Sequence, residues 1–263
     1  MSDFNGGTGG FAPTPPSRDP VPPPPPSMAP PPGYMPYGGA NQNAFGSFQR
    51  IGGLAKWLGI SLFALIAVQL VSVAKSVSDR GSAQDFIHEK ITEDQYTKSV
   101  GLSALLGLLS FVAFAAVAVL TIIWMFRIAK NLQLMQRVGT WKPGWAIGGW
   151  FVPPFVLYVV PFLMMRDLWK GSDPDTSGDW QSNTVASIVN VWWVLYGLAP
   201  VLFLGVTFSS FQLDRSAIDA AKEIDDKFAI TLASSAAQVV AAVVFLLLVR
   251  QLTERHRRTT SEA

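Results

Sequence analysis

Few residues in this chain have the chemistry of a catalytic site. There is no cysteine, which excludes disulfides, thiolate metal sites and cysteine nucleophiles. The two histidines, His88 and His256, both lie outside the apolar runs. Ser61 lies inside an apolar run and could be considered as a nucleophile, but a serine nucleophile needs a neighbouring base. The sequence therefore predicts no serine or cysteine enzyme.

The carboxylates form adjacent pairs and one loose cluster. The adjacent pairs are Glu93–Asp94 and Asp225–Asp226. Neighbouring residues point to different faces of a helix, so we interpret these pairs as solvated loop acids. Asp173, Asp175 and Asp179 could gather a hard divalent cation, but the stretch lacks the glycine and the terminal glutamate of a calcium loop. We therefore expect no metal, no cofactor and no enzymatic activity.

The most distinctive pattern is a row of cations with no acid between them. Arg127, Lys130, Arg137 and Lys142 are interleaved with, or followed by, three tryptophans: Trp141, Trp145 and Trp150. Cations beside interfacial aromatics favour anionic lipid headgroups, at about 1 kcal/mol per charge near the surface. The same residues could instead act only as topology determinants and anchors. The candidate inner-face platform comprises Arg127, Lys130, Asn131, Arg137, Lys142, Trp145, Trp150, Pro153, Arg166 and Trp169.

The composition indicates the environment in which these residues are placed. The chain has 263 residues, of which 49% are hydrophobic and 14% are charged. A soluble domain carries about 25% charged residues, so the sequence predicts an integral membrane protein. A net charge of +2 is too small to indicate nucleic-acid binding. The expected partner is the lipid bilayer, anionic lipid in particular.

Four apolar runs are each long enough to cross the hydrocarbon core as a helix, which takes about 20 residues. They are residues 54–74, 100–126, 188–208 and 228–249. Gln69, Asn190 and Gln238 are the polar residues singled out in these runs, and we expect them to hydrogen bond between helices. Ala233, Ala237 and Ala241 form a small-residue stripe that would permit close packing within the bundle or in a homo-oligomer.

A fifth apolar segment, residues 145–170, is interrupted by Pro153, Pro154 and Pro161. A proline inside a helix costs about 3 kcal/mol or more, so we expect a break between residues 145–152 and 155–170. If the segment returns to the side from which it entered, the Lys and Arg of residues 50–258 divide into 12 on the inner side and 7 on the outer. That bias is the one the positive-inside rule expects, whereas five spans would leave almost none.

The predicted fold is thus an all-α polytopic membrane helix bundle. It has four spans and a proline-broken re-entrant or interfacial segment, with five spans as the alternative. Both termini are expected to be cytoplasmic. Residues 1–50 form a Pro- and Gly-rich tail expected to be disordered, 51–252 the membrane domain, and 253–263 a basic C-terminal tail. "PPGY" at residues 31–34 matches a WW-domain ligand pattern, so the tail is either a docking site for protein partners or a solvated tether.

Several motifs together resemble a known family. They are "WMFRIAKNL" at 124–132, "WKPGWAIGGWFVPPFVLYVVPFLMMRDLWKGSDP" at 141–174 and "VWWVLYGL" at 191–198. This run resembles the actinobacterial membrane family known as domain of unknown function 4328, over about residues 54–250. The matching positions are Trp124, Arg127, Asn131, Pro143 to Trp145, Trp150 to Pro153, Arg166, Trp169, Ser172, Trp192 and Trp193. Residues 154–157 read PFVL where the family would have an Asn and a Leu. The resemblance implies a multi-pass protein of a bacterial plasma membrane, without an assigned activity.

These features favour a non-enzymatic scaffold or interaction platform at the inner membrane face. The alternative from a different class is a small-molecule permease or channel, with its path beside the broken helix at Pro153. A water-filled cavity reaching Pro153 would favour the permease, and a dry, filled bundle would favour the platform.

Overall fold

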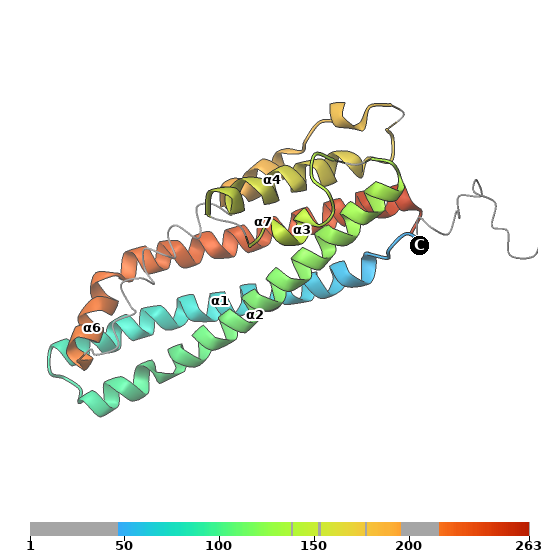
Figure 1. The fold of residues 1–263 in the computed structure, drawn as a ribbon. Helices are drawn as coiled ribbons and strands as arrows, with labels where there is room; N and C mark the ends of the chain where they lie inside the picture. The colour runs from blue at the N-terminus through green and yellow to red at the C-terminus, as the bar shows by residue number, and fades with distance from the viewer. Residues whose placement is uncertain (1–46, 138, 152–153, 177, 196–215, 263) are drawn as a thin grey trace, which may run out of the picture. The chain divides into compact units, whose positions relative to one another are not determined.

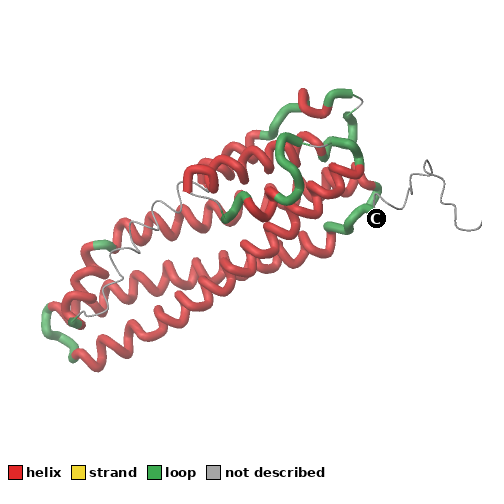
Figure 2. Tube along the Cα trace, in the orientation of Figure 1, coloured by secondary structure: helices red, strands yellow, loops and turns green. Residues whose placement is uncertain are grey.

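The computed structural model describes residues 47–137, 139–151, 154–176, 178–195 and 216–262. The chain divides into two units, 1–44 and 45–263, and every described residue belongs to the second. Within the described residues all regular structure is helical, which confirms the all-α prediction (Figure 2). Most of the expected tail, residues 1–46, lies outside the described residues.

Three long helices form the body of the second unit: α1 (Gly52–Ile87), α2 (Glu93–Leu134) and α7 (Phe228–Thr260) (Figure 1). All three are long and apolar enough to cross a membrane. They contain the expected apolar runs 54–74, 100–126 and 228–249, so these three helices are confirmed. The fourth expected run, 188–208, is described only as far as residue 195, and residues 187–195 are helical.

The helix ends follow from local sequence. Thr92 begins α2 with a capping box, because its hydroxyl accepts from the Gln95 N–H at 3.3 Å and the Gln95 side chain accepts from the Thr92 N–H at 2.9 Å. Gln136 follows α2 in the left-handed conformation, with φ of 59°. The next amide, that of Arg137, then donates back to the Leu132 carbonyl at 2.9 Å, as in a Schellman motif.

The proline-broken segment forms two helices, α3 (Trp145–Gly148) and α4 (Pro154–Gly171). The expected break is confirmed, and Pro154 is the first residue of the new helix, where its missing N–H costs least. Helix α4 continues through Pro161. At Gly149 a methyl group would come within 2.8 Å of Val160 Cγ1, so a glycine is needed where α3 meets α4.

Both ends of this segment lie together. The Arg137 guanidinium donates to the carbonyl oxygens of Gly171 at 2.9 Å and Asp173 at 2.8 Å. The chain that leaves α2 has therefore returned to the same end of the bundle by the end of α4. It continues through the short 3-10 helix η2 (Trp180–Ser182), and α6 (Ala217–Asp226) precedes α7.

The core lies where α1, α2 and α7 pack together, and Leu58, Trp124 and Leu248 are among its fully buried side chains. Gln69 on α1 donates to the Gln238 side chain on α7 at 2.9 Å, which confirms the expected hydrogen bond between helices. The two ends of the bundle are named here by one buried residue each. The His256 end contains the start of α1 and the last turns of α2, α4 and α7, and the Asp79 end contains the last turns of α1, the first turns of α2 and α7, and α6.

Candidate functional site

The candidate site at the His256 end is built around three fully buried polar side chains, His256, Asn131 and Ser172. They come from α7, from α2 and from the residue that follows α4. The His256 Nδ1 atom lies 2.8 Å from Ser172 Oγ, and its Nε2 atom lies 3.0 Å from Asn131 Nδ2. Both ring nitrogens are therefore hydrogen bonded without solvent, as buried polar groups require.

The contacts of Asn131 determine the tautomer of the histidine. Its amide oxygen accepts from the Gln49 N–H at 2.8 Å, and its amino group donates to the Gln49 carbonyl at 2.9 Å. That amino group also faces His256 Nε2, so Nε2 accepts and Nδ1 carries the proton. The Nδ1–H then donates to Ser172 Oγ. A protonated ring would set two donors against each other at Nε2.

Burial also favours the uncharged form of this histidine. His256 lies beyond the apolar run of α7, in its charged last turns. Burial of the ring lowers the pKa of His256 to about 4, and the Glu262 carboxylate opposes the shift only in part. At neutral pH the ring is therefore uncharged, which matches the hydrogen bonds it makes.

Further contacts fasten the chain around this centre. Trp124 Nε1 donates to Thr253 Oγ1 at 3.1 Å, and Thr259 Oγ1 donates to the Ser172 carbonyl at 2.8 Å. The Glu262 carboxylate accepts from the Ile51 N–H at 3.1 Å and the Gly52 N–H at 3.0 Å. A residue just past α7 thus caps the start of α1, where the helix dipole favours a negative charge.

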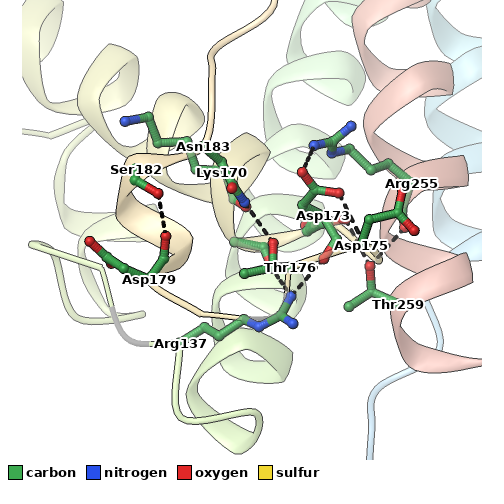
Figure 3. Close-up of polar contacts among 12 residues, drawn as sticks. Arg137, Lys170, Asp173, Asp175, Thr176, Asp179, Ser182, Asn183, Arg255 and Thr259 are labelled. Atoms are coloured by element: carbon green, nitrogen blue, oxygen red, sulfur yellow. Dashed lines mark hydrogen bonds and ion pairs between the residues drawn. The ribbon is translucent and has the colours of Figure 1, made fainter.

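The loop after α4 is held by the same end of α7 (Figure 3). The Arg255 guanidinium pairs with the Asp173 carboxylate at 2.6 Å, and the other Asp173 oxygen accepts from the Asp175 N–H at 3.2 Å. The Asp179 carboxylate accepts from the N–H of Gln181 at 3.0 Å. The carboxylates of Asp173 and Asp179 thus bind the loop and α7, whereas Asp175 is exposed. Across the described residues, no group of three acidic or histidine side chains has the arrangement of a metal site.

A serine beside a histidine resembles the pair that acyl-transfer enzymes use, and its burial decides what it can do here. A nucleophilic hydroxyl must be reached by the substrate, whereas the Ser172 and His256 side chains are both 0% exposed. The pair therefore acts as a structural clamp between α4 and α7. Because both ring nitrogens of the buried His256 are hydrogen bonded, the clamp also favours one arrangement of the three elements.

Some of the predicted platform residues have partners within the protein, and others are exposed. Arg127 donates to the Arg50 carbonyl at 2.9 Å in an exposed contact, while Arg137 binds the end of α4, so both guanidiniums have partners within the protein. Trp169 is buried, and the Arg255 guanidinium carbon lies 5.3 Å from the centre of its ring. Lys130, Lys142 and Trp145 are exposed.

The other predicted residues have intermediate positions. Trp150 is half-buried against the core, and the Arg166 Nε atom lies 3.9 Å from the Asp167 carboxylate in a weak pair. Pro153 lies outside the described residues. A cavity of about 20 Å³ is lined by Arg137, Trp141 and Asp167 among others, which is space for about one water molecule.

The sequence comparison identifies the family. A family model described as "Domain of unknown function (DUF4328)" matches residues 88–254. The chain belongs to the DUF4328 family. The resemblance of the motifs to this family is thereby confirmed. No curated protein and no solved structure matches the chain.

The DUF4328 motif residues meet at the clamp and beside it. Trp124, Asn131, Trp169 and Ser172 each contact the last turns of α7. Trp193 Nε1 donates to the Tyr158 carbonyl at 3.2 Å and thereby joins α4 to the helical residues 187–195. In this DUF4328 chain Trp169 and Ser172 therefore hold the end of α4 against α7, while Trp124 and Asn131 hold α2 against it.

Sequence reasoning missed His256, Thr253 and Thr259, because all three lie in or beside the segment interpreted as a basic tail. One signal could have found them. They are spaced three residues apart, so they lie on one face of a helix that continues past the apolar run.

Proposed function

We propose that this protein is a non-enzymatic integral membrane protein that presents a lipid-binding platform at the inner face of a bacterial plasma membrane. The observation that carries the proposal is an exposed apolar turn that follows the exposed Lys142, together with the exposed Lys130 near the end of α2. Trp145, Ile147 and Phe151 are 38%, 43% and 77% exposed, and Lys130 and Lys142 are exposed as well. We refer to these five residues as the lipid platform.

The residue types of the lipid platform suit the membrane interface. Aromatic and aliphatic side chains enter the boundary between headgroups and acyl chains, while lysines remain with the anionic headgroups. The bond from Arg137 to the Gly171 carbonyl closes the segment that carries Trp145, Ile147 and Phe151, and so restricts the shape of the platform. Arg127 and Arg137 have internal partners, so the two lysines are the better candidates for lipid contact.

The same contacts support a four-span topology in which residues 145–170 enter the membrane and return to the side from which they entered. The Arg137–Gly171 bond joins the two ends of the segment at the His256 end. If that end faces the cytoplasm, the Lys and Arg bias agrees with the positive-inside rule and both termini are cytoplasmic. The Pro-rich tail would then extend to protein partners as a tether, and the stripe at Ala233, Ala237 and Ala241 would be available for homo-oligomer contacts.

The permease alternative has less support. A broken helix can line a transport path, but Pro153 lies outside the described residues. The cavity near α4 has a volume of about 20 Å³, which is too small for a metabolite. The buried contacts of the clamp also resist the movement that alternating access requires.

The test measures the retention of anionic lipid by the purified full chain, using native mass spectrometry with phosphatidylglycerol as the probe. The variant Lys130→Gln/Lys142→Gln should bind about thirtyfold more weakly at low salt, because two charges contribute about 1 kcal/mol each. Raising the salt concentration should reduce the difference between variant and wild type, since headgroup attraction is screened.

The matched control is Lys90→Gln/Lys98→Gln, which removes two exposed lysines near the Asp79 end. It should leave retention unchanged. Equal retention by both double variants would mean that the lysines only orient the chain, and the platform proposal would fail.

A further inference from the structure

A second polar site lies at the Asp79 end, where a cavity of about 280 Å³ lies among α1, α2, α6 and α7. Lys75 and Asp79 line it, four residues apart on α1, and their side chains are only 17% and 9% exposed. Both follow the apolar run 54–74 directly. Withdrawing an ion pair from water costs desolvation energy that apolar residues would not incur, so such a pair beside a cavity indicates a binding role.

The hydrogen bonds in this cavity leave mainly acceptors available. Asp79 accepts from Lys75 on one oxygen and from the Ser103 hydroxyl on the other, and each oxygen retains a lone pair. Ser72 and Ser76 donate their hydroxyl protons to backbone carbonyls at 2.9 Å and 2.8 Å, so their oxygens remain acceptors. Lys75 also donates to the Ser99 carbonyl at 2.7 Å, which leaves one ammonium N–H.

Helix α6 and the start of α7 form the apolar wall of the cavity. Ile224 and Phe228 line that side. The Asp225 carboxylate accepts from Arg80 at 2.8 Å and from Gln84 at 3.0 Å, which fastens α6 to α1. The Arg80 guanidinium carbon also lies 4.6 Å from the centre of the Phe228 ring. The cavity thus has one acceptor-rich side and one apolar side.

We propose that this cavity binds a small zwitterion of amino-acid size. The ligand's ammonium group donates to Asp79 and to the serine oxygens, and its carboxylate accepts from Lys75. A volume of about 280 Å³ is near the lower end of ligand pockets, about 300–1,000 Å³, and suits a ligand smaller than a drug. The site lies at the end opposite the lipid platform and does not depend on that platform.

The first test uses the purified full chain in lipid nanodiscs, with glycine and L-leucine as probes and calorimetry as the measurement. Two analogues keep the leucine skeleton: 4-methylpentanoic acid lacks the ammonium group, and 3-methylbutylamine lacks the carboxylate. L-Leucine should bind at least about tenfold more tightly than either analogue, because each analogue loses one of the two charged contacts that the zwitterion makes with Lys75 and Asp79. Equal binding of either analogue overturns the proposal, as does failure of both glycine and L-leucine to bind at millimolar concentration.

The second test uses variants of the cavity. Asp79→Asn should abolish the preference for L-leucine over 4-methylpentanoic acid. Because that change also alters a buried ion pair, Thr231→Leu provides a second variant that fills the cavity without changing either charge. It should weaken L-leucine binding at least about tenfold, whereas Thr97→Leu, at an exposed position of α2, should not. Unchanged binding by Thr231→Leu would show that the ligand binds elsewhere.

Discussion

Acidification should destabilise this protein through His256. Burial lowers the pKa of the folded-state ring to about 4, whereas an unfolded histidine titrates near its ordinary value of about 6.5. Between these values the unfolded chain takes up a proton that the folded chain refuses. The contribution of His256 to the free energy of unfolding is therefore constant above about pH 7, falls as the pH drops through about 6.5, and levels off below about pH 4.

The magnitude follows from the width of that window. Each pH unit within it costs about 1.4 kcal/mol, so lowering the pH from about 7.5 to about 4.5 should remove about 2.5 kcal/mol. The physical reason is local. A second ring proton would have to lie in a fully buried site, facing the amino group of Asn131 at 3.0 Å. No solvent reaches the site to compensate.

The assay compares denaturant unfolding of wild type, His256→Gln and His88→Gln in detergent at the two pH values. His88 is exposed, so His88→Gln is the matched control and should lose as much stability as wild type. His256→Gln cannot titrate and should lose about 2.5 kcal/mol less over the same interval. If all three proteins lose the same amount, His256 titrates normally in the folded state and the buried clamp described here is wrong.

Three further predictions concern topology, a helix end and the tail. The topology test labels single-cysteine variants of the protein in intact cells with an impermeant maleimide. A cysteine in place of the exposed Asp175 should be protected, and one in place of the exposed Thr97 should react. Labelling at both positions would exclude the four-span topology. Gln136→Gly should raise stability by about 0.5 kcal/mol, because relief of strain in the left-handed backbone outweighs the added freedom of the unfolded chain. Gln133→Gly, within α2, should instead lower stability by about 1 kcal/mol. Denaturant midpoints measure both effects, and effects of the same sign would contradict the Schellman assignment. Deleting residues 2–44 should leave thermal stability unchanged, whereas deleting 2–51 removes Gln49 from Asn131 and should lower it; a large loss from the shorter deletion would contradict this expectation.

The sequence by itself determined the elements whose cause is local. Hydropathy along 54–74, 100–126 and 228–249 was enough to predict α1, α2 and α7, because burial of the backbone in lipid demands long apolar helices. Pro153 and Pro154 predicted the break between α3 and α4, since proline acts on its own helix. Gln69 and Gln238 stood out as polar residues in apolar runs, and they bond to each other.

Only the tertiary structure decided which polar residues became partners. His256 meets Ser172 and Asn131, which are 84 and 125 residues away, so no local pattern pairs them. Arg127 and Arg137 looked equivalent to Lys130 and Lys142 in sequence, yet in the structure each arginine donates to a backbone carbonyl of another segment. Lys75 and Asp79 lie past the apolar run 54–74, and only the structure shows that α1 continues to Ile87 and that this pair is largely buried. Hydropathy and helix propensity depend on residues that are close together in the sequence, whereas the partner of a buried polar group depends on which distant segments pack together.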